Sequence, residues 1–427
     1  MEMGDIESLD LIKNNNTTIV REKISTSNRI NPKKEELRKV KKIKKKLHAI
    51  DCLISVIIIC FLVVSFWRCV WTLMDLYVDY LPKYATFFNA VLLHVFIMQY
   101  AEIIKRFIGF DKDKLKKNVK YSIIRRVYVY FYSVICILQW QTGWSIMDEW
   151  VGIKMLPDGR ATKEDGLYGT IIVFGLSLFC LITMKSLRNC LAAPFVIILD
   201  NSTAPYDIPT RFRTNMAEKT TLYVLDCIFS VLVVGTLVVF VWRGAWVLLD
   251  DFLFPESASL SAWCSLVIGY LAVGLAFLLQ PVMRWVCDRL QGGLRLIAAD
   301  IFLLFSLFGT VNVWRGIWTL LNLYFLPDNQ EISCWITHWI CLILLVLLGC
   351  SNSLLVRGVY IDAEEPAGKC VIFPCYYLRL IFQQERAKKI AKRLQLDILA
   401  KRKQDIDNNI ADINHMVHEK QPNNHVV

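Results

Sequence analysis

Three arginines stand between paired tryptophans at the ends of long apolar runs, and they are the residues of this sequence best placed to do chemistry. They are Arg68, Arg243 and Arg315, in "FWRCVWTLMDLYVDYLP", "VWRGAWVLLDDFLFP" and "VWRGIWTLLNLYFLP". An arginine cannot be deprotonated in a protein. An unpaired one in hydrocarbon costs from about 2.5 kcal/mol to well over 10 kcal/mol. Each guanidinium must therefore pair with an acid or reach a polar surface.

One spacing underlies these stretches and a looser copy that begins at Gln139. We call it the tryptophan motif: two tryptophans and an acid or amide, at steps of four residues. Such steps place the three side chains on one helix face. In the second motif Gln141 replaces the arginine, and a proline follows every motif, at positions 82, 157, 255 and 327. The aligned residues are Trp67, Trp71 and Asp75; Trp140, Trp144 and Asp148; Trp242, Trp246 and Asp250; and Trp314, Trp318 and Asn322.

Two interpretations of the arginines remain open. In the first, they face the interior of a helical bundle and form a ring that binds an anion or a lipid headgroup. In the second, they lie in an aromatic belt near the outer membrane interface and reach headgroup phosphates or the acid or amide seven residues on. Seven residues are close to two helical turns, so Asp75 lies roughly along the stripe of Arg68. We favour the second interpretation.

The elements that carry the motifs are expected to be membrane-spanning helices. The chain has 427 residues, of which 55% are hydrophobic, and its mean hydropathy is +0.41. About 20 apolar residues are needed to cross a ~30 Å hydrocarbon core. The sequence predicts eight such helices, at 50–74, 84–104, 127–147, 168–185, 222–249, 262–283, 298–321 and 334–356.

Charge is divided between the two sides of this predicted bundle. Lysine and arginine crowd the N-terminal arm, the segments 105–126, 185–219 and 284–295, and the C-terminal tail, and acids gather in the opposite loops. The positive-inside rule then places both termini in the cytoplasm, as an even number of spans requires. We expect the first span to be an uncleaved signal anchor, because a lysine-rich arm precedes it.

Each motif is followed by a short connection and a second apolar run, so the sequence predicts four repeated helical hairpins. All four start and end on the same side, which favours parallel repeats around an axis near the membrane normal. The predicted fold is an all-α integral membrane protein. The expected domains are a basic cytoplasmic arm at 1–49, an eight-helix bundle at 50–360 and a cytoplasmic tail with an amphipathic helix at 361–427.

The tail carries a heptad pattern that suits a partner protein. Its apolar positions are Leu396, Leu399, Ile406, Ile410 and Ile413, with Lys403 as a polar residue at an a position. Such a helix pairs with a partner helix or lies on the bilayer. A frayed tail is the third alternative.

The sequence contains no catalytic motif, phosphate-binding loop or zinc spacing, so we expect no enzyme activity, metal or cofactor. The basic cytoplasmic surface predicts contact with anionic inner-leaflet lipids, not with nucleic acid. Transport remains an alternative, because His94, Glu102, Gln280 and His338 lie within or near the return helices.

The chain resembles the Fuseless family of multi-pass membrane proteins. The resemblance rests on "VWRGAWVLLDDFLFP", "VNVWRGIWTLLNLYFLP" and "SNSLLVRGVYIDAEEPAGKC", on an eight-span plan covering residues 50–370. It implies a presynaptic plasma-membrane protein of neurons that organises the release site and its voltage-gated calcium channels. The other class of function is a transporter or channel for a small anion or lipid that uses the intramembrane arginines.

Overall fold

The structure is a computed structural model of the whole chain. It describes residues 49–77, 80, 82–107, 119–153, 166–200, 202–214, 220–356, 358–366, 368–373 and 377–419. The chain divides into two units, residues 1–51 and 52–427, and the fold below is that of the second unit. The predicted N-terminal arm lies outside the described residues except for Ala49, and so does Pro157 of the second motif.

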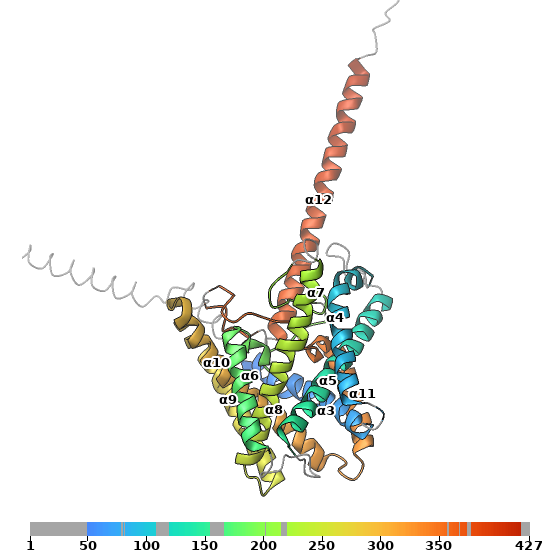
Figure 1. Cartoon of the computed structure of the whole chain (residues 1–427). Coiled ribbons are helices and arrows are strands. Elements are labelled where there is room, and N and C mark those ends of the chain that lie inside the picture. The colour runs from blue at the N-terminus through green and yellow to red at the C-terminus, as the bar shows by residue number, and fades with distance from the viewer. Residues whose placement is uncertain are drawn as a thin grey trace, which may run out of the picture. The chain divides into compact units, whose positions relative to one another are not determined.

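The described part of the chain is helical and contains no strand. The prediction of an all-α protein is therefore confirmed for these residues. The main helices are α3 (Cys60–Leu76), α4 (Lys83–Phe107), α5 (Val119–Val151), α6 (Leu167–Thr183), α7 (Thr220–Ile228), α8 (Gly235–Phe252), α9 (Ala258–Arg289), α10 (Gly292–Tyr324), α11 (Gln330–Leu348) and α12 (Tyr377–Glu419) (Figure 1). Short helical turns are η1 (Ile54–Ile59), η3 (Leu187–Cys190), η4 (Phe229–Val234) and η5 (Ser351–Leu354).

Seven of the helical stretches in the described residues are long and apolar enough to cross a membrane. They are Ala49–Leu76, Lys83–Phe107, Lys120–Val151, Thr220–Phe252, Ala258–Arg289, Gly292–Tyr324 and Gln330–Leu348. The remaining predicted run, 168–185, coincides with α6, an apolar helix of 17 residues. A helix of that length is about 26 Å long, at the lower limit of a membrane span.

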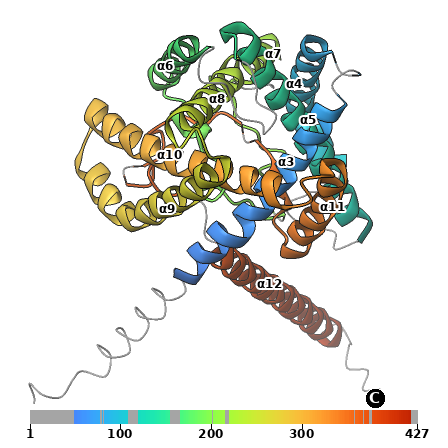
Figure 2. The same cartoon turned by 90° about the horizontal axis from the view of Figure 1, so that it is seen from below.

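The helices pack in a ring whose neighbours differ from the predicted hairpins. We call α3, α5, α8 and α10, which carry the tryptophan motifs, the motif helices, and α4, α6, α9 and α11 the return helices. Each return helix packs most extensively on the next motif helix: α4 on α5, α6 on α8, α9 on α10, and α11 on α3 (Figure 2). The two helices of each predicted hairpin therefore do not form a packed unit. A loop joins only their ends, whereas the fit of side chains decides which helices pack.

The closest of these contacts, between α9 and α10, depends on glycine. A Cβ atom on Gly269 would lie 2.5 Å from the backbone nitrogen of Val313, and one on Gly316 would lie 2.7 Å from that of Leu266. Small residues at such positions let two membrane helices approach closely enough for extensive van der Waals contact.

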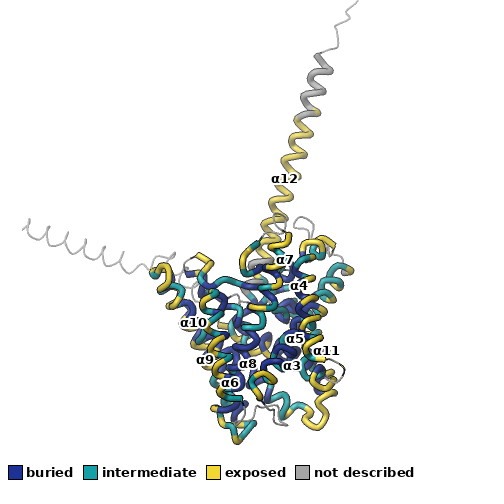
Figure 3. The backbone as a smooth tube through the Cα atoms, viewed as in Figure 1, coloured by how far each residue is buried: buried dark blue, intermediate teal, exposed yellow. Residues whose placement is uncertain are grey.

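Two irregular segments, 187–199 and 350–373, complete the core at the end of the bundle where the return helices finish. Phe195 and Phe373 are buried there, with ring centroids 4.5 Å apart. Buried residues gather inside the bundle, whereas the described part of α12 is mostly exposed (Figure 3). The Asp362 carboxylate accepts hydrogen bonds from the backbone nitrogens of Leu187 (2.7 Å) and Arg188 (2.9 Å) and so joins the segments. Burial raises the pKa of Asp362 to about 6.

Residues beyond the predicted start of the tail at 361 pack on the bundle before α12 begins at Tyr377. Asp362, Cys370, Val371 and Phe373 are buried in the bundle core. The apolar residues of "CVIF" at 370–373 explain this packing, because leaving them in water would forgo their hydrophobic stabilisation.

Replacement of Gly269 by valine is expected to destabilise the protein by about 1–3 kcal/mol, because the added atoms meet backbone that cannot rotate away. The matched control is Gly274→Val in the same helix, where a Cβ atom would have no neighbour within 4 Å. The melting temperature of the purified protein in detergent measures the effect. Equal melting temperatures for the two variants would contradict the close α9–α10 contact.

Candidate functional site

The first tryptophans of the four motifs form a closed ring. Trp67 contacts Trp140 and Trp314, and Trp242 contacts the same two residues, with centroid distances of 5.2 to 5.8 Å. All four contacts are edge-to-face, the arrangement that suits the charge distribution of aromatic rings. We call this set the first tryptophan ring.

A second tryptophan ring lies one helical turn further along the motif helices. Trp71 contacts Trp144 and Trp318, and Trp246 contacts the same two residues, at centroid distances of 5.1 to 5.9 Å. These contacts are also edge-to-face. The four-residue step between the two tryptophans of each motif thus places one member in each ring.

A polar ring connects the same helices through the residue after the first tryptophan of each motif. Arg243 Nε and Nη2 donate to the two carboxylate oxygens of Asp148 at 2.5 and 2.9 Å. Arg315 Nε donates to Asp250 at 2.8 Å.

Two further pairs of the polar ring each involve an amide. Arg68 Nε donates to Asn322 Oδ1 at 2.6 Å, and Gln141 Nε2 donates to Asp75 Oδ1 at 2.7 Å. Each donor thus reaches the acid or amide of the preceding motif, and Asn322 of the last motif closes the cycle with Arg68.

The return helices supply further oxygen atoms to two of the arginines. Arg315 Nη2 donates to Ser261 Oγ of α9 at 2.7 Å. Both terminal nitrogens of Arg68 lie 3.4 Å from Ser333 Oγ of α11. Ser261 and Ser333 each stand in the first turn of their helix, so the two contacts are related in the same way to their motifs.

The favoured interpretation of the arginines as membrane-interface anchors is wrong. The exposed fractions of Arg68, Arg243 and Arg315 are 0%, 1% and 0%, so none reaches a headgroup. Their partners lie on the neighbouring motif helix, not seven residues along their own. The acid or amide on the same helix lies about 10 Å further along the axis, whereas the adjacent helix supplies one within hydrogen-bond distance.

The alternative interpretation, an arginine ring that binds an anion, also needs a correction, because two of the arginines already have anionic partners. The arginines are buried within the bundle, but Arg243 and Arg315 are ion-paired with Asp148 and Asp250. The polar ring contains three guanidinium groups and three carboxylates, which balance. It therefore offers no surplus positive charge to an anion.

Backbone carbonyls cover one face of the first tryptophan ring. The indole nitrogens of Trp67, Trp242 and Trp314 donate to the carbonyl oxygens of Leu354 (3.1 Å), Cys190 (2.9 Å) and Ala193 (2.8 Å). Sequence reasoning missed this contribution from the segments 187–199 and 350–373. The apolar run "LAAPFVIIL" inside a basic loop was the signal that could have revealed it.

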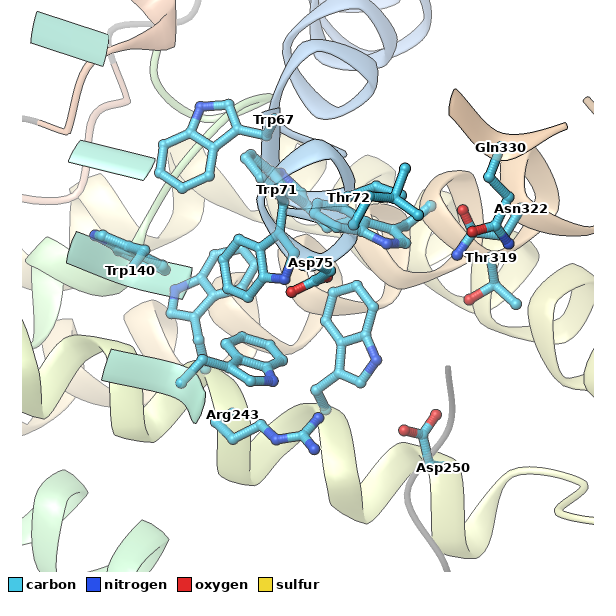
Figure 4. Close-up of a pocket in the computed structure, with 16 residues that line it drawn as sticks. Trp67, Trp71, Thr72, Asp75, Trp140, Arg243, Asp250, Thr319, Asn322 and Gln330 are labelled. Carbon is cyan, nitrogen blue, oxygen red and sulfur yellow. The ribbon is translucent and has the colours of Figure 1, made fainter. Parts of the chain in front are cut away.

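A cavity of about 280 Å³ lies on the other side of the first ring (Figure 4). All eight tryptophans of the two rings line it. A smaller cavity of about 60 Å³ is lined by the first ring and by residues of the two covering segments. The first tryptophan ring therefore separates two cavities and closes the axis of the bundle. The polar and charged side chains of the larger cavity are Thr72, Asp75, Arg243, Asp250, Thr319, Asn322 and Gln330.

The other candidate residues do not join this site. His94 contacts Gln139 and Tyr132 through its two ring nitrogens, and His338 contacts Tyr130. The predicted partner residues lie on α12, where four of the five are exposed: Leu396, Leu399, Ile406 and Ile410. The side chain of Ile413 lies outside the described residues.

The fold and this site define a multi-pass helical membrane protein whose motif helices are joined by two aromatic rings and one polar ring. The model of the Fuseless family matches residues 46–355 of the chain, and the chain belongs to this family. The match contains all four tryptophan motifs and confirms the resemblance seen in the sequence. No curated protein and no solved structure matches the chain.

Replacement of Arg315 by alanine is expected to cost about 3–5 kcal/mol, because it leaves the buried Asp250 carboxylate without its cation. Arg315→Gln should cost less, since it recreates the pairing that Gln141 makes with Asp75. The melting temperature of each variant, purified in detergent, tests this order. Wild-type stability of the alanine variant would contradict a structural role of the polar ring.

Proposed function

We propose that this protein is a non-enzymatic, multi-pass plasma-membrane protein that organises the presynaptic release site and its voltage-gated calcium channels in neurons, supporting synaptic transmission. Membership of the Fuseless family supports the membrane setting, and the resemblance implies the synaptic role. The observation that carries the proposal is the contrast between a closed helical bundle and a long helix, α12, whose described side chains are mostly exposed.

Helix α12 has the properties of a docking element. Its hydrophobic residues Leu396, Leu399, Ile406 and Ile410 are each more than half exposed. The heptad spacing of these residues supports pairing with a helix of a partner protein. Tyr377 at its start is buried, and the Tyr377 hydroxyl donates to the Leu348 carbonyl at 2.6 Å. The proposed partners are cytoplasmic or membrane proteins, including calcium channels.

The basic residues of α12 support a second contact, with anionic lipids of the inner leaflet. Lys388, Lys389, Lys392 and Arg393 are exposed within one short stretch of the helix. Each basic residue near such a surface contributes about 1 kcal/mol to lipid binding. Binding to the membrane surface would hold α12 close to partner proteins in the same membrane.

Transport is the weaker candidate. The edge-to-face contacts of the first tryptophan ring close the axis, and the arginines proposed to carry an anion are engaged within the polar ring. An anion would have to displace Asp148 or Asp250 from a buried ion pair, which is costly. These contacts support the organiser proposal over transport.

Four substitutions on α12, Leu396→Glu, Leu399→Glu, Ile406→Glu and Ile410→Glu, are expected to reduce proximity labelling of calcium channels at least tenfold. A charge at each apolar position of the heptad opposes helix pairing. Matched controls are Gln404→Glu and Asn408→Glu, which add acids at exposed positions of the same helix outside the heptad. Proximity labelling in neurons, normalised to surface protein, measures recruitment. Unchanged labelling with the heptad variant would contradict the proposal.

The proposed topology has eight spans, with α6 as the shortest, and both termini in the cytoplasm. Epitope tags at the two termini should then bind antibody only after the cells are permeabilised. A C-terminal tag that is accessible on intact cells, together with a protected N-terminal tag, would show an odd number of spans. Helix α6 would then not be one of the spans. The tags are read in the full chain by fluorescence microscopy.

A further inference from the structure

One carboxylate of the polar ring lacks a cation. Asp148 and Asp250 are ion-paired with arginines, whereas the Asp75 carboxylate accepts a hydrogen bond from the uncharged Gln141 amide. Among the described residues no lysine or arginine forms a salt bridge with Asp75. Asp75 lines the 280 Å³ cavity and is exposed.

The balancing positive charge is turned away from this cavity. Arg68 carries the charge that Asp75 leaves unmatched, but its side chain is fully buried between Asn322 and Ser333 and does not line the cavity. The other charged side chains that line the cavity are Arg243 and Asp250. Each of them forms an ion pair of the polar ring. The cavity therefore presents one negative charge that the polar ring does not neutralise.

The walls around this charge are aromatic. Eight tryptophans line the cavity, and tryptophan gives the strongest attraction between a cation and an aromatic face. Arg243 already shows such a contact, with its guanidinium carbon 4.9 Å from the centre of the Trp144 ring. Among the described residues, no group of three or more acidic, histidine or cysteine side chains could hold a metal ion. A weakly hydrated organic cation instead gains from indole faces and one carboxylate.

We propose that this cavity is a binding site for a small organic cation that carries a quaternary ammonium group. The methyl groups of the ligand lie against the two tryptophan rings, and its charge lies beside Asp75. The volume is just below the ~300–1,000 Å³ of typical ligand pockets, which suits a small molecule or a headgroup. This proposal rests on the cavity alone and does not depend on the organiser function.

Two sources could supply the same chemistry. The cavity lies at the level of the second tryptophan ring, near the ends of the motif helices, where headgroups meet a spanning helix. The ligand is then either a free quaternary ammonium compound or the choline headgroup of a phospholipid. The test below separates these sources.

The probe is tetramethylammonium, titrated by calorimetry into the full chain purified in a maltoside detergent, which contains no choline. Saturable one-to-one binding is expected. Asp75→Asn, which keeps the size of the side chain, and Trp71→Phe should each weaken binding roughly tenfold or more. Asp328→Asn, which removes an exposed acid outside the cavity, is the matched control and should bind as the wild type does.

The neutral isostere 3,3-dimethyl-1-butanol, compared with choline, separates recognition of charge from recognition of shape. Choline should bind and the isostere should not. Absence of saturable tetramethylammonium binding, equal binding of the isostere, or unchanged affinity in both cavity variants would overturn the proposal. Gel filtration establishes that each variant is folded, and Asp75→Glu, which restores the charge, should recover binding if the asparagine variant is unstable.

The source is decided in lipid nanodiscs. Phosphatidylcholine nanodiscs should lower the apparent affinity for tetramethylammonium at least tenfold relative to phosphatidylglycerol nanodiscs if the headgroup occupies the cavity. Equal affinity in the two lipids would assign the site to a free ligand. Either result supports a quaternary ammonium site, and loss of binding in both lipids would contradict it.

Discussion

The structure depends on a buried guanidinium group that must be paired inside an apolar bundle. An arginine at such a depth costs several kcal/mol unless hydrogen-bonding oxygen atoms surround it. Here the oxygen atoms come from the preceding motif helix in the cycle and, for Arg68 and Arg315, from a serine on a return helix. The requirement to satisfy each arginine therefore fixes which helices are neighbours and at what register.

The aromatic rings follow from the same geometry. Once the polar ring sets the register, the paired tryptophans of each motif meet their counterparts at two levels, one helical turn apart. Their edge-to-face contacts contribute about 0.5–1.5 kcal/mol each beyond area burial. The indole N–H groups of the first ring then need acceptors. Backbone carbonyls of two irregular segments provide them for Trp67, Trp242 and Trp314, and the same segments cover the end of the ring.

The sequence was sufficient to predict the helices and the face on which the motif lies, because steps of four residues are a property of one helix. It was not sufficient to predict the partners of that face. The spacing of Arg68 and Asp75 suggested a pair within one helix, but the structure pairs Arg68 with Asn322, which is 254 positions away. The roles of Asp362 and of the "LAAPFVIIL" run were hidden for the same reason, since they arise from contacts between distant segments.

The cyclic order of the polar ring also has a consequence for biosynthesis. Arg68 belongs to the first motif helix to leave the ribosome, whereas Asn322 and Ser333 belong to the last quarter of the chain. The guanidinium of Arg68 therefore enters the membrane long before its partners exist. Until α10 and α11 are present, this guanidinium needs another polar environment, because an unpaired arginine in hydrocarbon is costly. A chain truncated before these two helices lacks both Asn322 and Ser333, the side chains that accept hydrogen bonds from Arg68 in this fold.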